Sequence, residues 1–202
     1  MDKLKKIKKN YSRGMTYVEL IVVLSIFSVM TSVVVFNYGG FQAKVDIKNL
    51  ASDIALKIVE AQKSSVSGEL PLRSMPTDWK PSYGVYIDID NDNKSFFYFT
   101  DLGIQDGIFN DTICGGTGEC LDKITITKGN IISRLEVFGT GCLGTTVDNL
   151  NILFKRPNSG AIISSNPPLS CSSIFYAQIT IDSPEDSMAT INIYPSGRIQ
   201  IN

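Results

Sequence analysis

The pattern of hydrophobic and polar positions divides this chain of 202 residues into three parts. From Met15 to Phe36 nearly every position is apolar. In a helix this stretch is about 33 Å long at about 1.5 Å per residue, which matches a bilayer hydrocarbon core of about 30 Å. The pattern therefore predicts a transmembrane helix over residues 15–38.

Beyond this stretch, apolar side chains recur every three or four residues, which is the spacing of one helix face. The face consists of Ile47, Leu50, Ile54, Ile58 and Ala61. Residues 39–68 are therefore predicted to form an amphipathic helix that continues the anchor and ends near Ser67-Gly68. Gly39-Gly40 is expected either to soften the helix or simply to kink it, since a helical glycine is unfavourable by about 1 kcal/mol.

From Tyr83 onward the period changes to two, which is typical of strands with one buried face. Turns rich in Pro, Gly, Asn and Ser separate these stretches, so residues 69–202 are predicted to form an exported β-rich head domain. The expected strands begin at Tyr83 and continue at Ser95–Thr100, Lys123–Lys128, Ile131–Phe138, Leu150–Lys155, Ala161–Ser164, Ile174–Asp182, Ala189–Tyr194 and Arg198–Ile201. The predicted fold class is α+β, with the long N-terminal helix packed on an antiparallel β-sheet.

Charge is distributed unevenly along the chain. Residues 1–14 contain six Lys or Arg and one Asp, whereas the rest contains 13 Lys or Arg and 19 Asp or Glu, a net charge of −6. A basic segment ahead of an apolar one is expected to stay in the cytoplasm, so the domain downstream is exported. The acidic balance argues against a nucleic-acid binder.

The chain contains no histidine. This removes the commonest general base and the commonest neutral metal ligand. We therefore expect no cofactor and no enzymatic activity.

The four cysteines all lie in the C-terminal half, at Cys114, Cys120, Cys142 and Cys171. An even number downstream of a membrane segment predicts two disulfides in an oxidising compartment, whereas zinc would require paired CxxC spacing. The sequential pairing is favoured because the short Cys114–Cys120 loop closes at low entropic cost. Cys142 and Cys171 are expected in connecting loops.

Three acids, Asp88, Asp90 and Asp92, surround a predicted turn, and calcium prefers such clustered carboxylates. The spacing of an EF-hand is not met, because Asn93 stands where glycine is needed and Phe99 where the closing Glu is needed. A hairpin turn is the favoured interpretation, with calcium as the weaker alternative. A second acidic stretch, residues 101–111, presents the same choice.

Glu19 is the residue that interrupts the apolar segment with a charge. A carboxylate in lipid is unfavourable by roughly 2.5–3.5 kcal/mol or more at mid-membrane, and it marks a functional position. The alternative is that its side chain only reaches the membrane interface near the helix start.

The stretch Arg13-Gly14-Met15-Thr16-Tyr17-Val18-Glu19-Leu20, with its basic leader and apolar continuation, resembles the cleavage and methylation site of type IV pilins and type II secretion pseudopilins. The resemblance implies that a prepilin peptidase removes residues 1–14 by cutting between Gly14 and Met15, and that Met15 is then N-methylated. It further implies that Glu19 pairs with the terminal amine of a neighbouring subunit during assembly. Tyr17 replaces the more usual Leu.

Two further stretches resemble the GspH/FimT group of minor pseudopilins. They are the helix around Leu50–Gln62 and the last hairpin, Ala189–Ile199, with its Ser-Gly-Arg turn ending at Arg198. DNA-binding members of that group carry a second Arg two residues after the first. That position is Gln200 here, which weakens a DNA-uptake function.

Together these features predict a structural, minor subunit of a type IV pilus or type II secretion pseudopilus. Its expected partners are the prepilin peptidase/methylase, other pilin or pseudopilin subunits and the membrane, with no nucleic acid. The N-terminus is expected in the cytoplasm and the head outside it, in a periplasmic or cell-surface filament after assembly. The alternatives are a filament-tip adhesin or DNA-uptake pilin of the same architecture and, more remotely, a membrane-anchored exported enzyme.

Overall fold

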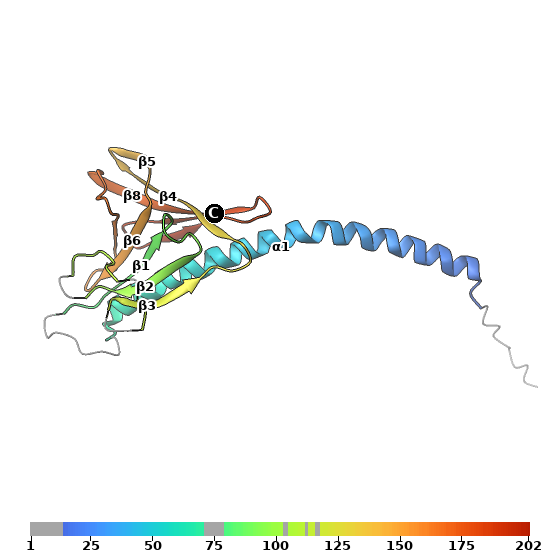
Figure 1. Ribbon diagram of the computed structural model, residues 1–202, viewed down its shortest axis with the longest axis horizontal. Helices are drawn as coiled ribbons and strands as arrows, with labels where there is room; N and C mark the ends of the chain where they lie inside the picture. The colour runs from blue at the N-terminus through green and yellow to red at the C-terminus, as the bar shows by residue number, and fades with distance from the viewer. Residues whose placement is uncertain (1–13, 71–78, 103–104, 112, 116–117) are drawn as a thin grey trace, which may run out of the picture. The chain divides into compact units, whose positions relative to one another are not determined.

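A long helix, α1 (Tyr17–Ser67), opens the computed structural model, which describes residues 14–70, 79–102, 105–111, 113–115 and 118–202 (Figure 1). Gly68 adopts a φ of +72° immediately after the helix. Its amide donates to the Ser65 carbonyl, and the Glu69 amide donates to the Ser64 carbonyl. These two bonds form a Schellman cap, which favours glycine because the left-handed conformation is strained by a Cβ. The predicted helix end at Ser67-Gly68 is therefore confirmed.

The chain divides into two compact units between Gly39 and Gly40. The helix continues across both glycines without interruption. Neither glycine has a neighbouring atom within 4 Å of the position that a Cβ would occupy. Nothing packed against these positions therefore requires glycine for space.

Ten strands follow α1 in the described part of the second unit, and all their pairings are antiparallel. The first sheet has the order β3-β2-β1-β6-β7 and the second the order β10-β9-β8-β4-β5. The strands are β1 (Ser82–Asp88), β2 (Ser95–Thr100), β3 (Cys120–Thr125), β4 (Ile131–Thr140), β5 (Cys142–Thr146), β6 (Asn149–Lys155), β7 (Ala161–Ser164), β8 (Ser173–Asp182), β9 (Met188–Ile193) and β10 (Ile199–Ile201).

One hydrophobic core joins the second half of α1 to both sheets. The helix contributes the predicted stripe, in which Ile47, Ile54, Ile58 and Ala61 are at most 2% exposed and Leu50 is partly buried. The sheets contribute the inward-facing side chains of β1, β2, β6 and β7 on one side and of β4, β8 and β9 on the other. The α+β prediction of a helix packed on antiparallel sheets is confirmed.

A second apolar cluster covers the outer face of the first sheet. Phe109 packs there against Phe97 and Phe99 of β2, with ring centroids 5.2 Å away in both cases. The Phe109 amide also donates to Asn151 Oδ1 of β6 at 2.9 Å. Every residue of β2 is consequently buried, and this strand reads in the sequence as a continuous apolar run rather than as an alternating one.

Two strand predictions need correction. Residues 142–146 form β5, so Cys142 lies in a strand and not in the connecting loop that the sequence suggested. Strand β5 is an edge strand with mostly exposed side chains, and Gly144 within it has a φ of +68°. Such a strand carries little periodic signal. Strand β3 begins at Cys120, three residues before the predicted start at Lys123.

Candidate assembly site

The N-terminus of α1 is capped by the side chains of Thr16 and Glu19, both of which belong to the predicted motif. Thr16 Oγ1 accepts a hydrogen bond from the Glu19 amide at 3.3 Å, and Glu19 Oε2 accepts one from the Thr16 amide at 3.4 Å. This reciprocal arrangement is a capping box, which satisfies two amides that the first turn of a helix leaves free. The Thr-x-x-Glu spacing ahead of an apolar run predicts such a cap from sequence. Interpreting Glu19 only as a charge within a membrane segment misses it.

The cap gives Glu19 a structural role within the single chain. A carboxylate at the helix N-terminus faces the positive end of the helix dipole, which is favourable by about 0.3–1 kcal/mol. Glu19 is nevertheless exposed, so the carboxylate stays accessible to a second partner from outside the chain.

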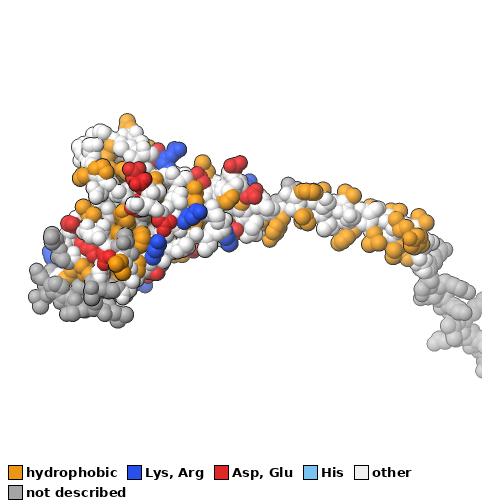
Figure 2. All heavy atoms as spheres, viewed as in Figure 1, with side chains coloured by type: hydrophobic (Ala, Val, Ile, Leu, Met, Phe, Trp, Pro, Cys, Tyr) orange, Lys and Arg blue, Asp and Glu red, His pale blue; other side chains and the backbone are white. Residues whose placement is uncertain are grey.

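The first half of α1 carries mostly apolar side chains, and every side chain described there is exposed. Figure 2 shows apolar side chains along the face of this half that is in view. Phe27 is 67% exposed and Phe36 is 85% exposed. Two polar side chains in this stretch bond to their own helix: Ser25 Oγ donates to the Val22 carbonyl and Thr31 Oγ1 to the Phe27 carbonyl, each at 2.8 Å. By length and composition this stretch suits a membrane span or a signal segment.

The predicted cleavage site precedes the helix. Met15 is 58% exposed, and no atom lies within 4 Å of the position that a Cβ on Gly14 would occupy. Residues 1–13, which make up most of the predicted leader, lie outside the described residues. Cleavage after Gly14, methylation of Met15 and the assembly role of Glu19 stay predictions.

The head contains the two disulfides suggested by the sequence, Cys114–Cys120 and Cys142–Cys171. The first disulfide joins Cys114, in the segment between β2 and β3 whose Phe109 covers the first sheet, to the start of β3. The second joins β5 to the segment before β8. Disulfides persist in oxidising compartments and are rare in the cytosol. They therefore indicate an extracytoplasmic head.

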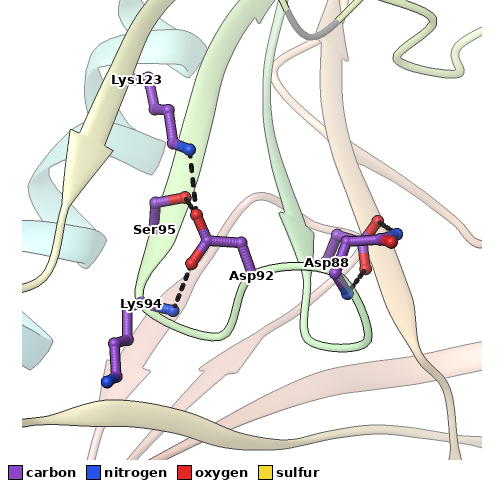
Figure 3. A network of polar contacts seen from close by, with 6 residues as sticks. Asp88, Asp92, Lys94, Ser95 and Lys123 are labelled. Carbon is purple, nitrogen blue, oxygen red and sulfur yellow. Dashed lines mark hydrogen bonds and ion pairs between the residues drawn. The ribbon is translucent and has the colours of Figure 1, made fainter.

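Two carboxylates of the first acidic cluster, Asp88 and Asp92, accept hydrogen bonds at the turn between β1 and β2 (Figure 3). Asp88 accepts hydrogen bonds from the amides of Asp90 and Asn91 and from the Tyr86 hydroxyl. These bonds lower the pKa of Asp88 against an opposing effect of burial, which is the largest single cause.

Asp92 lies in the same turn but bonds to different groups. It accepts hydrogen bonds from Ser95 Oγ at 2.7 Å, from the Lys94 amide and from Lys123 Nζ, both at 3.0 Å. The Ser95 and Lys123 bonds lower its pKa to about 2. Asp88 and Asp92 thus belong to separate hydrogen-bond networks (Figure 3). Because β1 and β2 pair antiparallel, the turn that carries both residues is a hairpin turn.

Two other carboxylates hold the segment that covers the first sheet. Asp101 is fully buried; its Oδ2 accepts from the Gly107 amide at 3.1 Å, whereas its Oδ1 has no hydrogen-bond partner among the described residues. Burial raises its pKa to about 6, with Glu119 and Asp106 adding repulsion. Glu119 accepts from the amides of Leu102 and Asn110, and burial raises its pKa as well.

Across the described ranges, no group of three or more His, Cys, Asp or Glu side chains is arranged to hold a metal ion.

The polar side chains of the last hairpin contact one another. Arg198 lies over the Tyr194 ring at 4.0 Å, and Gln200 accepts from the Tyr194 hydroxyl at 3.3 Å.

Comparison with protein-family models, with curated proteins and with solved structures finds no match to this chain. What the structure supports is therefore an architecture: a long apolar N-terminal helix whose second half packs on antiparallel sheets. This architecture is consistent with that of pilins.

Proposed function

We propose that this protein is a structural, minor subunit of a filament of the type IV pilus or type II secretion pseudopilus class. The observation that carries the proposal is the start of α1, where one carboxylate, Glu19, caps a helix whose first half is mostly apolar and exposed. In a soluble monomer such a helix would expose its apolar surface to water, so this surface requires lipid or other helices.

Processing supplies the partner for Glu19. A prepilin peptidase/methylase cuts between Gly14 and Met15 and methylates the new terminus at Met15. The cut creates an ammonium group one residue before Thr16, which is the first member of the capping box. When subunits assemble, Glu19 of one subunit pairs with the terminal amine of its neighbour. Neither charge is then left alone in a low-dielectric bundle, and the pairing fixes the register between the helices.

The location follows from the same segment. Before assembly the protein spans the membrane once, with its basic N-terminus in the cytoplasm and its disulfide-bonded head outside. After assembly the head lies on a periplasmic or cell-surface filament. The subunit has no catalytic role and no cofactor, and its partners are other pilin or pseudopilin subunits rather than nucleic acid.

Substitutions at the capping box test the proposal. Glu19→Ala removes both the cap and the charge, whereas Glu19→Gln keeps an acceptor at this capping position and removes only the charge. We expect both variants to insert into membranes and both to lose filament assembly, measured as the sheared extracellular or periplasmic fraction. Thr16→Ala is the matched control, because it removes the other half of the cap, worth about 1 kcal/mol, and keeps the charge. Assembly of Glu19→Gln at the wild-type level would reduce Glu19 to a capping residue.

Mass spectrometry of the mature N-terminus tests processing separately. The expected product begins with methylated Met15. A protein that still begins with Met1, or one cut beyond Phe36, contradicts the proposal.

A further inference from the structure

The end of the head at which α1 terminates carries a pocket with a cationic lining. The pocket has a volume of about 360 Å³, and its described lining residues include the cations Lys80, Lys155 and Arg156 and no acid. None of these three cations forms an ion pair with another described residue. In a head with an excess of acidic residues, three cations that gather around one pocket and have no ion pair among the described residues favour an anionic partner.

Two contacts locate this pocket beside the last turns of α1. The Pro81 carbonyl accepts hydrogen bonds from Ser65 Oγ at 3.1 Å and from the Arg156 amide at 3.0 Å. In addition, the Arg156 guanidinium lies against Gly68, where it would meet a Cβ. We call Lys80, Lys155 and Arg156 the cationic pole.

The opposite charge gathers on the hairpin between β8 and β9. Glu185 and Asp186 are exposed at its tip, and Asp182 lies at the end of β8. Pro184 of this hairpin lies against Gly129, at 2.9 Å from the position of a Cβ there. We call the two exposed acids, Glu185 and Asp186, the acidic pole.

The acidic pole lies near the beginning of the head rather than near its end. Lys128, next to Gly129, donates to Asp46 Oδ1 of α1 at 2.7 Å. Lys128, a cation in the loop that contacts the hairpin, is thus already paired with Asp46 of the helix. From Asp46 to Ser65 the helix rises by about 28 Å at about 1.5 Å per residue, so the two poles belong to opposite ends of the same domain.

We propose that the acidic pole of one copy docks in the cationic pole of a second copy. The two patches differ, are complementary in charge and lie at opposite ends of one domain. This is the arrangement of a heterologous contact, which repeats into an open chain instead of closing into a dimer. The inference rests on the proposed function and deepens it, because it names a second copy of this subunit as one of the neighbours in the filament.

The positions of the poles within the head limit how two copies can meet. Because the poles lie at opposite ends of the head, the acidic hairpin of one copy reaches the cationic pocket of the next only when the two heads are displaced along the part of α1 that belongs to the head. Two heads aligned at the same level therefore do not form the contact.

Carbodiimide crosslinking of the purified full chain in detergent tests the contact, because this reagent joins only touching amines and carboxylates. We expect isopeptide links from Lys80 or Lys155 to Glu185 or Asp186, identified by mass spectrometry and reduced at high salt. Such links can arise only between copies, since the poles of one copy lie too far apart. Absence of these links across a concentration series overturns the inference.

Charge reversal makes the test specific. We expect Glu185→Lys with Asp186→Lys to lower the crosslinked dimer about tenfold, and the further changes Lys155→Glu and Arg156→Glu in the same chain to restore it within about twofold. Asp53→Lys with Asp122→Lys is the matched control, because it changes the net charge equally at two exposed positions outside both poles. Failure of the swapped chain to recover, or an equal loss in the control, contradicts the contact. Leader cleavage and the Glu19 variants report on the proposed function independently.

Discussion

The two halves of α1 have the same backbone structure but differ in what surrounds them. From Tyr17 to Gly39 every described side chain is exposed, whereas between Gly40 and Ser67 one stripe is buried against both sheets. The second half is therefore stabilised by its own chain. The first half finds no apolar partner in the described chain and depends on lipid or on neighbouring helices. The first half of α1, for which we propose a role in assembly, is thus distinct from the half that folds with the head.

Truncation of a large side chain in each half is the strongest test of this comparison. Ile54 is fully buried, and Ile54→Ala is expected to lower the free energy of unfolding of the head by about 2–5 kcal/mol, through lost burial and a cavity. The matched change Val29→Ala, at a position that is 66% exposed, is expected to leave it unchanged. Urea unfolding of the full chain in detergent, followed by the near-ultraviolet signal of the head, measures both. A comparable loss in Val29→Ala would show that the first half also supports the head.

The disulfides sharpen the comparison because both belong to the head. Reducing the unfolded chain's entropy is the main effect of a disulfide, and it grows with loop length. The Cys142–Cys171 bridge spans 29 residues and the Cys114–Cys120 bridge spans 6. Replacing Cys142 and Cys171 by serine is expected to destabilise the head by about 3–4 kcal/mol. Replacing Cys114 and Cys120 by serine is expected to destabilise it by about 2 kcal/mol. Equal losses, or impaired membrane insertion, would contradict this account.

Much of this organisation can be predicted from the sequence. The apolar run, the stripe from Ile47 to Ala61 and the Ser67-Gly68 end each produce a local pattern of fixed period or composition, and the structure follows them. Most strands are also readable, because one face is buried and the other is exposed. The pairing of the cysteines follows from loop length.

Features that depend on distant contacts are not readable in this way. Strand β5 exists because it pairs with β4, and its own sequence, with Gly144 at a positive φ, gives no strand period. The burial of Asp101 depends on the segment that folds over the first sheet. The opposed poles of the head require the topology of both sheets, because Lys80 lies far along the chain from Lys155 and Arg156, and the acidic hairpin lies further on.

The buried carboxylate Asp101 predicts a dependence on pH that is confined to the head. Its pKa is raised from 3.8 to about 6, mainly by burial, so the folded state holds this proton more tightly than the unfolded state does. Its contribution to stability is therefore fully present below about pH 4 and is lost as the pH rises through about 6. The full loss corresponds to about 3 kcal/mol.

Asp101→Asn removes this titration. The variant is expected to gain stability relative to the wild type between pH 4 and pH 7, and urea unfolding at several pH values measures the difference. Asp92, whose pKa is lowered to about 2, contributes in the opposite sense at lower pH in both proteins and cancels in the comparison. Asp90→Asn, at an exposed turn position, is the matched control. A gain that does not vary with pH would mean that burial of the charge is not its cause.

The boundary between the two halves gives the smallest expected effect. Gly39 and Gly40 are helical, and a Cβ at either position would meet no atom within 4 Å. Alanine at both positions is therefore expected to stabilise this part of α1 by about 1 kcal/mol per residue. Because neither glycine contacts the core, the midpoint of head unfolding should not move, while amide exchange around residues 38–42 should slow by about fivefold per substitution. If unfolding of the head also shifted, the two halves would be coupled across the glycines, and the separation of folding from assembly within α1 would not hold.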